Sequence, residues 1–316
     1  MAAGGDVMGD RGVGTFLDKN GGPAVFAQVK PYLDKADVAF VNLEGPVSDK
    51  GTQAVGKEVT FRARPALIDG LASAGIDVVS QANNHSLDYG SAALLDTILR
   101  LGTVGIAHAG AGANDKAAAA PALLETPAGT VAVLAFTDII PGGFPAGPAR
   151  AGVNPASPDR DKVLASIKAA KARADYVIVS FHWGIEYTAG ANQDQRDLAH
   201  AAIDAGADLV LGHHPHVIQG LELYRGKLIA YSLGDFVFDH YSQATGETFI
   251  LELVLPAQGS PKFEIVPVYV NDTTGVPAPV TGKAADSILT RLTALSANLG
   301  LQLTREGDRA AFFGTT

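Results

Sequence analysis

The sequence predicts an α/β protein, and three observations carry that prediction. Short, almost continuously apolar runs recur along the chain, as expected for strands that are covered on both faces of a sheet. Stretches of helical character separate these runs, and several of them end at a glycine, the usual helix stop signal. Strands and helices that alternate at this spacing are typical of α/β architectures.

The predicted elements follow in chain order. Buried strands are expected at 36–43, 76–82, 131–137, 176–181, 208–212 and 227–233. Helices are expected at 65–74, 91–101, 158–173 and 194–205. The proline-rich stretch 138–160 reads as a long loop, and long loops inside compact domains are commonly functional.

The pattern changes after about residue 245. The runs 247–256 and 262–271 follow each other without a helix between them, so we expect an antiparallel pair. A helix over 284–299 closes the chain. We therefore predict one domain over 1–275, with a helical extension over 276–316 packed on it.

Composition excludes several classes of protein. The chain has 316 residues, 47% hydrophobic and 18% charged, which rules out a disordered polypeptide. Its net charge of −9 argues against a general binder of nucleic-acid backbones. The absence of Cys excludes disulfides, thiolate metal sites and a Cys nucleophile, so any metal must be held by His and oxygen ligands. No run approaches the roughly 18 apolar residues of a membrane-spanning helix.

Polar residues gather where the predicted strands end, which is where open α/β sheets build their sites. These blocks are Gly5-Asp6, Asn42-Leu43-Glu44, Asn83-Asn84-His85 with Asp88, His182 with Glu186, Gly212 to His216, and Gly234-Asp235. Each block has a structural alternative: a strand-end Asp is often a cap, Asn-Asn often makes a turn, and His182 fits a core position beside Trp183. Three His within four residues, stiffened by Pro215, instead favour metal binding.

The remaining histidines are expected to be structural. His200 lies mid-helix and is expected to face solvent, and His108 is expected in a loop. His240 is a weak candidate for supporting the site. The sequence lacks a Gly-x-Ser-x-Gly elbow, a P-loop and a complete dinucleotide fingerprint, so those enzyme classes are disfavoured.

Taken in order, the polar blocks resemble the bacterial capsule-synthesis family typified by CapA/PgsA of poly-γ-glutamate production. That family is similar to the calcineurin-like metallophosphoesterases. The resemblance spans about residues 4–275 and rests on six blocks in the family's order, among them Ala-Asn-Asn84-His85-Ser-Leu-Asp88-Tyr-Gly, Gly-His-His214-Pro-His216-Val and Tyr-Ser-Leu-Gly-Asp235-Phe. It implies an αββα sandwich of two packed mixed sheets flanked by helices.

The resemblance also implies roles for individual residues. The ligands of one or two divalent ions (Mn, Zn or Fe) would be Asp6, Glu44, Asn84, His182, His214 and His216. His85, oriented by Asp88, would act as general acid toward the leaving group. Arg11 and Arg62 would hold an anionic group of the substrate, with surface ion pairing as the alternative. Further contacts to the substrate or to the ligands are expected from Asn42, Glu186, His213 and Asp235.

Three departures from the metallophosphoesterase pattern stand out. The opening Asp-x-His reads Asp6-Val7-Met8, so one ligand of the first metal is absent. Glu44 stands where an Asp is usual. The strand that should precede Asp6 is expected to be nearly missing, because only five residues come before it.

Two functions follow from the resemblance. The first is a metal-dependent hydrolase or transferase acting on a phosphoester, or on amide or ester bonds of an anionic polymer such as poly-γ-glutamate, in capsule or cell-envelope metabolism. The second is a non-catalytic capsule-assembly or polymer-binding protein. The expected partners are the anionic substrate and other capsule-synthesis proteins, without nucleic acid and without a membrane span. The start of the chain shows no signal peptide; a bacterial protein of the cell envelope is expected if a signal or anchor was trimmed, and a cytoplasmic one otherwise.

Overall fold

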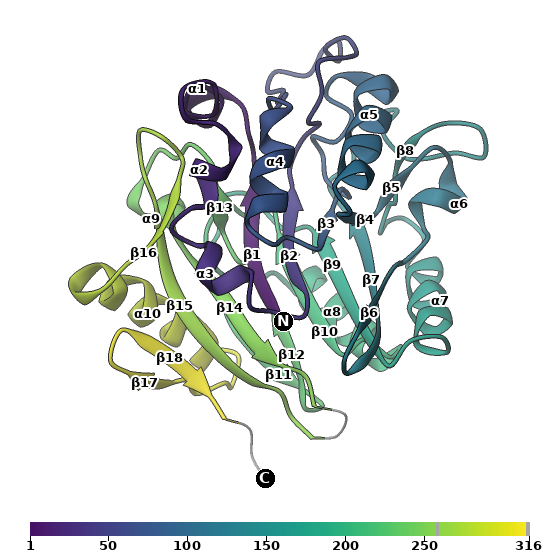
Figure 1. The fold of residues 1–316 in the computed structure, drawn as a ribbon. Coiled ribbons are helices and arrows are strands. Elements are labelled where there is room, and N and C mark those ends of the chain that lie inside the picture. Colours follow the sequence, from purple (N-terminus) through teal and green to yellow (C-terminus); the bar gives the residue numbers. More distant parts are fainter. Residues whose placement is uncertain (257–258, 314–316) are drawn as a thin grey trace.

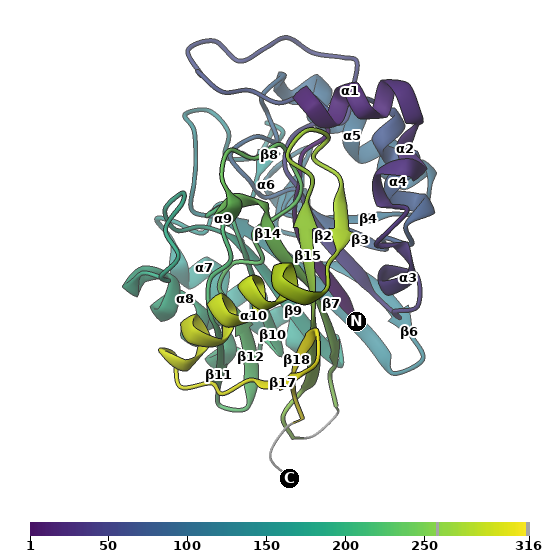
Figure 2. The ribbon, with the colours of Figure 1, turned by 90° about the vertical axis from the view of Figure 1, so that its left-hand side faces the viewer.

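The computed structural model describes residues 1–256 and 259–313. Two mixed β-sheets pack face to face, and helices cover both outer faces (Figure 1). Seen from the side, helices α1–α4 lie on one face of this sandwich and α7 and α8 on the other (Figure 2). The α/β class and the layered architecture predicted from the sequence are confirmed.

The first sheet has ten strands, in the order β17-β18-β15-β14-β1-β2-β3-β4, with β13 beside β1 and β16 beside β15. Its parallel half consists of β1 (Ala2–Val7), β2 (Ala39–Leu43), β3 (Val78–Ser80), β4 (Ala107–Ala109) and β13 (Asp235–Val237). The remaining strands are antiparallel: β14 (Glu247–Val254), β15 (Lys262–Val270), β16 (Pro277–Pro279), β17 (Thr304–Glu306) and β18 (Arg309–Phe312).

The second sheet has six strands, in the order β11-β12-β10-β9-β7-β6. Its four central strands are parallel: β7 (Gly129–Thr137), β9 (Tyr176–His182), β10 (Leu209–His213) and β12 (Lys227–Ala230). The edge strands β6 (Ala122–Thr126) and β11 (Leu221–Tyr224) run antiparallel to their neighbours. A separate two-stranded sheet joins β5 (Ala111–Gly112) to β8 (Gly152–Val153).

The helices sort by the face that they cover. The outer face of the first sheet packs against α1 (Arg11–Asn20), α2 (Gly22–Phe26), α3 (Lys30–Leu33) and α4 (Ala66–Ser73). The outer face of the second sheet packs against α7 (Arg160–Lys171) and α8 (Gln193–Asp204). The others are α5 (Gly90–Thr103), α6 (Asp115–Ala118), α9 (Gln243–Gly246) and α10 (Gly282–Ala297).

The core between the sheets is built from both of them and is closed at one side by α10. Phe40 of the first sheet and Ile178 of the second belong to one buried cluster, together with Ile288 and Leu292 of α10. The segment after residue 275 also supplies β16, β17 and β18 to the first sheet, so it is not purely helical as predicted. The division of the chain at residue 275 stays a prediction.

The N-terminal strand corrects one expectation. The sequence predicts that a strand before Asp6 is nearly missing, yet β1 spans Ala2–Val7 and is fully buried. Its short length suffices because β2 pairs along one side, while β14 and β13 pair with its first and second halves on the other. The predicted antiparallel pair after residue 245 is confirmed as β14 and β15.

Two outlying histidines also differ from expectation. His108 lies in β4 rather than in a loop. His200 is half-buried rather than facing solvent, because its ring stacks on Tyr224 at 3.9 Å and its Nε2 lies 2.9 Å from Glu222 Oε1. In the described residues, no helix is both long enough and apolar enough to cross a membrane.

Asp208, directly before β10, joins three elements of the second sheet. Its carboxylate accepts hydrogen bonds from the Val177 backbone N–H at 2.9 Å, from Lys171 at 2.9 Å and from Lys227 at 2.8 Å. Burial alone would raise the pKa of Asp208, but these donors lower it below its usual value. The charged carboxylate therefore stabilises the folded state at neutral pH.

We predict that Asp208→Ala lowers the free energy of unfolding by about 1–3 kcal/mol at neutral pH, because a buried backbone donor loses its partner. The difference in stability between wild type and the variant should shrink at low pH. It should begin to shrink below about pH 4 and shrink further as the pH falls through the lowered pKa of Asp208 in the folded state, because wild-type Asp208 then becomes protonated and loses its charge. Urea unfolding at several pH values measures this. The control is Asp204→Ala, which breaks a surface ion pair with Arg225 and a long, exposed hydrogen bond from Tyr224 Oη at 3.4 Å, and should change stability by less than about 1 kcal/mol. An Asp208 variant as stable as that control would contradict the prediction.

Candidate metal centre

The carboxyl ends of the parallel strands of both sheets meet at one edge of the sandwich. Asp6 lies on β1 opposite Asn42 of β2, and Glu44 follows β2 directly. On the second sheet, His182 ends β9 opposite His213, which ends β10. The register of the parallel strands therefore brings together side chains that are far apart in sequence.

Asp6 is fully buried and well supplied with donors. Its Oδ1 accepts a hydrogen bond from Asn42 Nδ2 at 2.9 Å, and its Oδ2 accepts one from the His214 backbone N–H at 3.1 Å. His213 Nδ1 lies 3.0 Å from Oδ1. Burial would raise the pKa of Asp6, but His213 and the other donors lower it overall, so Asp6 is ionised at neutral pH.

Glu44 has the opposite environment. Its side chain is buried, and neither carboxylate oxygen has a hydrogen-bond partner among the described residues. The nearest ring nitrogens, His85 Nε2 and His216 Nε2, each lie 3.9 Å from Oε1. Burial, followed by the charges of Asp6 and Asp235, raises the pKa of Glu44 well above its usual value. A carboxylate placed in this way needs a cation or a proton to offset its desolvation.

The histidines differ in their protonation. Burial and the neighbouring histidines lower the pKa of His182 well below its usual value, and burial lowers that of His214 to about 3. Both rings are neutral at neutral pH, which is the form that binds metals. Burial would also lower the pKa of His216, but Asp235 and Glu44 raise it to about 10. Its Nδ1 lies 2.8 Å from Asp235 Oδ1.

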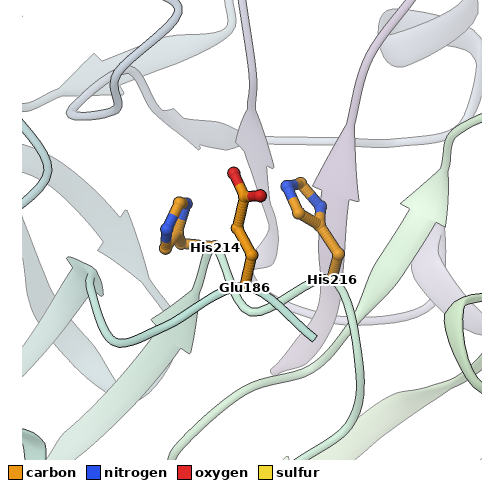
Figure 3. A group of neighbouring side chains, drawn as sticks. All are labelled: Glu186, His214 and His216. Atoms are coloured by element: carbon orange, nitrogen blue, oxygen red, sulfur yellow. The ribbon is translucent and has the colours of Figure 1, made fainter. Parts of the chain in front are cut away.

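Three groups of residues bring three ligand atoms within 4.8 Å of one another: Asp6, Glu44 and His182; Asp6, His216 and Asp235; and Glu186, His214 and His216, drawn in Figure 3. These are the oxygen and imidazole donors that Mn, Zn and Fe accept. Together with the unpartnered Glu44 carboxylate, they show that the residues fit a divalent cation. Five of the six predicted ligands belong to these groups, and the sixth, Asn84, contacts one of them through its Oδ1, which lies 2.8 Å from His182 Nε2.

Glu186 and Asp235, which the sequence places outside the ligand set, also belong to these groups. Asp235 reaches the centre because β13 pairs with β1 in a register that sets Asp235 opposite Asp6. His213 does not belong to any of the three groups, and its ring lies against Phe40 with centroids 5.7 Å apart. Asn42 donates to Asp6 and accepts from Asn83, so it connects two of the polar blocks.

His85 and Asp88 form a pair beside Glu44. His85 Nδ1 lies 2.6 Å from Asp88 Oδ2, and the ring stacks on Phe61 at 4.0 Å. Asp88 is held in turn by the Phe61 backbone N–H at 2.7 Å. These contacts fix the ring and direct its Nε2 toward Glu44.

Lys57 is a component of the site that the sequence analysis missed. Its ammonium group donates to Asp88 and to the Asn84 backbone carbonyl, the latter at 2.6 Å, and lies 3.0 Å from His85 Nδ1. Burial lowers the pKa of Lys57, while the charge of Asp88 acts in the opposite direction. Lys57 comes from a polar loop without a recognisable motif, so no sequence signal was available to find it.

A cavity of about 270 Å³ opens onto this centre. Its lining includes Arg11, Lys57, His85, Glu186, His216 and Asp235. Arg11 donates to Tyr241 Oη at 2.9 Å and lies 3.5 Å from Asp239. Arg62 does not line the cavity; its guanidinium stacks on Tyr89, 4.2 Å from the ring centroid. His240 lines the cavity and its Nε2 lies 2.8 Å from the Val270 carbonyl.

The loop 138–160, for which the sequence suggested a functional role, does not contribute to the lining of this cavity. The loop contacts the centre from behind: the Asp138 backbone N–H donates to the His182 carbonyl at 2.9 Å, and the Phe144 ring lies 5.5 Å from the Lys57 ammonium.

The fold and the site together define an α/β sandwich protein with a candidate metal centre at the joined strand ends. The chain belongs to the family described as bacterial capsule synthesis protein PGA_cap, whose profile matches residues 1–240. It is 36% identical to the PGA biosynthesis protein CapA of Bacillus subtilis, over 87% of this chain and 72% of that protein. It is 35% identical to the capsule biosynthesis protein CapA of Bacillus anthracis, over 88% and 68%.

Another relative, matched over less of the chain, has an accessory role in its name. The probable polyglutamine synthesis accessory protein of Mycobacterium tuberculosis is 37% identical over 69% of this chain and 60% of its own length. Among solved structures, a hypothetical protein from Thermus thermophilus superposes with a TM-score of 0.47 and 18% identity, over 88% of this chain and 95% of that one.

We predict that Glu44→Gln stabilises the metal-free protein by about 1–2 kcal/mol at neutral pH, because a neutral amide replaces a buried carboxylate without a donor. The same change should remove most of the stabilisation gained on adding Mn²⁺, since bound metal stabilises only the folded state. Thermal unfolding after chelation, with and without Mn²⁺, measures both effects.

The matched control is Glu58→Gln, which makes the same chemical change at an exposed position. It should alter stability by less than about 0.5 kcal/mol and leave the response to Mn²⁺ intact. If Glu44→Gln destabilised the metal-free protein and kept the full response to Mn²⁺, the prediction would be wrong.

Proposed function

We propose that this protein is a metal-dependent hydrolase or transferase of capsule or cell-envelope metabolism. It acts on a phosphoester, or on an amide or ester bond of an anionic polymer such as poly-γ-glutamate. The observation that carries the proposal is the buried, unpartnered carboxylate of Glu44, which shares a group of three ligand atoms within 4.8 Å with Asp6 and the neutral His182. The Bacillus subtilis relative is named for PGA biosynthesis and the Bacillus anthracis relative for capsule biosynthesis, which supports this setting.

The proposed ligands are Asp6, Glu44, Asn84, His182, His214 and His216, holding one or two ions of Mn, Zn or Fe. Bound there, a divalent cation would supply Lewis acidity toward an oxygen of the substrate. Asp6 brings a permanent negative charge, and His182 and His214 bring neutral imidazoles. The protein contributes a rigid frame, because most of these side chains are buried at strand ends.

His85 is the proposed proton donor to the leaving group. Asp88 holds its Nδ1, which leaves Nε2 facing the site next to Glu44. Because burial lowers the pKa of His85, the donor role requires that the ring takes up a second proton on Nε2 when substrate binds. Phe61 fixes the plane of the ring by stacking.

Arg11 lies on the cavity wall and is placed to bind a carboxylate or phosphate of the substrate. Arg62 is not placed to do so, because it stacks on Tyr89 outside the cavity. The cavity volume suits one monomer-sized group of a polymer rather than a long segment.

A second function, a non-catalytic capsule-assembly or polymer-binding protein, is favoured by Met8. Met8 stands where the metallophosphoesterase pattern has a ligand, and its side chain is buried against Phe61 and Phe238. The accessory role named for the mycobacterial relative agrees with this alternative.

The two functions predict different results for His85→Asn. For the enzyme, turnover should fall by about 100-fold or more with a phosphodiester whose alcohol is a poor leaving group, and much less with a nitrophenyl ester, whose leaving group needs little protonation. Bound metal should stay unchanged. The measurement is steady-state hydrolysis of both esters and of poly-γ-glutamate by the Mn²⁺-loaded protein.

His200→Asn is the matched control, because His200 packs on Tyr224 away from the centre. It should retain wild-type turnover. If metal-loaded wild type binds poly-γ-glutamate but cleaves none of these substrates, the enzyme proposal fails and the polymer-binding function takes its place.

A further inference from the structure

One of the three ligand groups combines residues from two loops at the cavity. Glu186 comes from the loop after β9, whereas His214 and His216 come from the loop after β10. In Figure 3 the Glu186 carboxylate lies between the two imidazole rings, and one ligand atom from each residue lies within 4.8 Å of the others. Glu186 is exposed, while both histidines are buried, so the group reaches from the interior to solvent.

The backbone holds these loops against each other. The Tyr187 N–H donates to the Pro215 carbonyl at 2.8 Å, between the two histidines and next to Glu186. Tyr187, His214 and His216 have φ angles of 60°, 95° and 56°, which residues other than glycine rarely adopt. Backbone strain of this kind persists where the surrounding structure fixes it, and it concentrates at binding sites.

Two polar groups here lack the partners that a purely structural role would provide. His214 is 5% exposed, and its Nδ1 has no hydrogen-bond partner among the described residues. Within the same part of the chain, no Lys, Arg or His forms a salt bridge with Glu186 at 4.0 Å or less, although Asp239 in the same cavity lies 3.5 Å from Arg11. A surface carboxylate held beside two buried imidazoles, with no salt bridge within 4.0 Å among the described residues, is arranged to receive a metal cation.

We propose that Glu186 is a direct metal ligand, which with His214 and His216 binds a divalent cation of the Zn²⁺ or Mn²⁺ class at the solvent side of the centre. The inference rests on the proposed function and adds a seventh ligand to it. Two imidazoles and one carboxylate form a donor set of catalytic zinc sites, which keep another coordination position open. Glu186 and His216 line the cavity, so a cation held by this group would be within reach of an oxygen of the anionic substrate.

The test is metal binding rather than activity. Wild type, Glu186→Gln and Asp239→Asn are each stripped of metal and equilibrated with Zn²⁺ over a range of concentrations, and bound metal is counted by elemental analysis. Losing a supporting partner of a ligand typically weakens binding 10–100-fold. Losing the Glu186 ligand should therefore weaken the binding of one Zn²⁺ ion by about 100-fold or more. The absorption spectrum of the Co²⁺-loaded variant should also differ from that of wild type.

Asp239→Asn removes the same charge from the same cavity without touching any of the three ligand groups, so it should bind Zn²⁺ as wild type does. Equal weakening in both variants would overturn the inference, because it would reflect only the charge of the cavity. Unchanged binding and an unchanged Co²⁺ spectrum in Glu186→Gln would overturn it as well. The proposed function would survive either result if Glu44→Gln lost metal, whereas a wild type that binds no metal would overturn both.

Discussion

The pairing of β1 with its neighbours is the constraint on which the rest of the centre depends. Gly5 passes so close to the loop before β13 that a Cβ on it would lie 1.8 Å from the Gly234 carbonyl oxygen. Only glycine permits this approach, and the approach sets Asp6 beside Asp235. β2 on the other side brings Asn42 to Asp6 in the same way, so one short strand positions the polar side chains of two others.

This packing concentrates negative charge in a buried place. Asp6, Glu44 and Asp235 are all at most 2% exposed, and burial together with their mutual repulsion raises the pKa of Glu44 and of Asp235, the latter to about 7. Without metal, His216 offsets part of this charge by staying protonated next to Asp235. Because a protonated imidazole cannot bind a metal, an incoming cation has to displace that proton, and metal affinity should therefore rise with pH.

The sequence predicted what depends on local patterns. Apolar runs located the central strands, and the polar residues at their ends located the centre, because parallel strands end at a common edge. It could not predict contacts that depend on loop conformation. Lys57 reaches Asp88 from a polar loop, and Glu186 reaches the two histidines through positive φ angles at non-glycine residues. Nor could it predict α1–α3: α1 carries two interior glycines, and α2 and α3 have only five and four residues, so these segments are helical because they pack on the first sheet.

Met8 shows why the ligand count alone does not decide between an enzyme and a binding protein. Its sulfur accepts a hydrogen bond from the Asp10 N–H at 3.0 Å, and its side chain is part of the wall formed with Phe61 and Phe238. The position is thus hydrophobic, and Met8 brings no oxygen or nitrogen ligand to the centre. From the neighbouring strand β13, however, Asp235 brings a carboxylate within reach of Asp6 and His216. This carboxylate adds to the negative charge of the centre, which favours a cation. The centre therefore keeps a set of oxygen and imidazole donors beside the hydrophobic side chain of Met8.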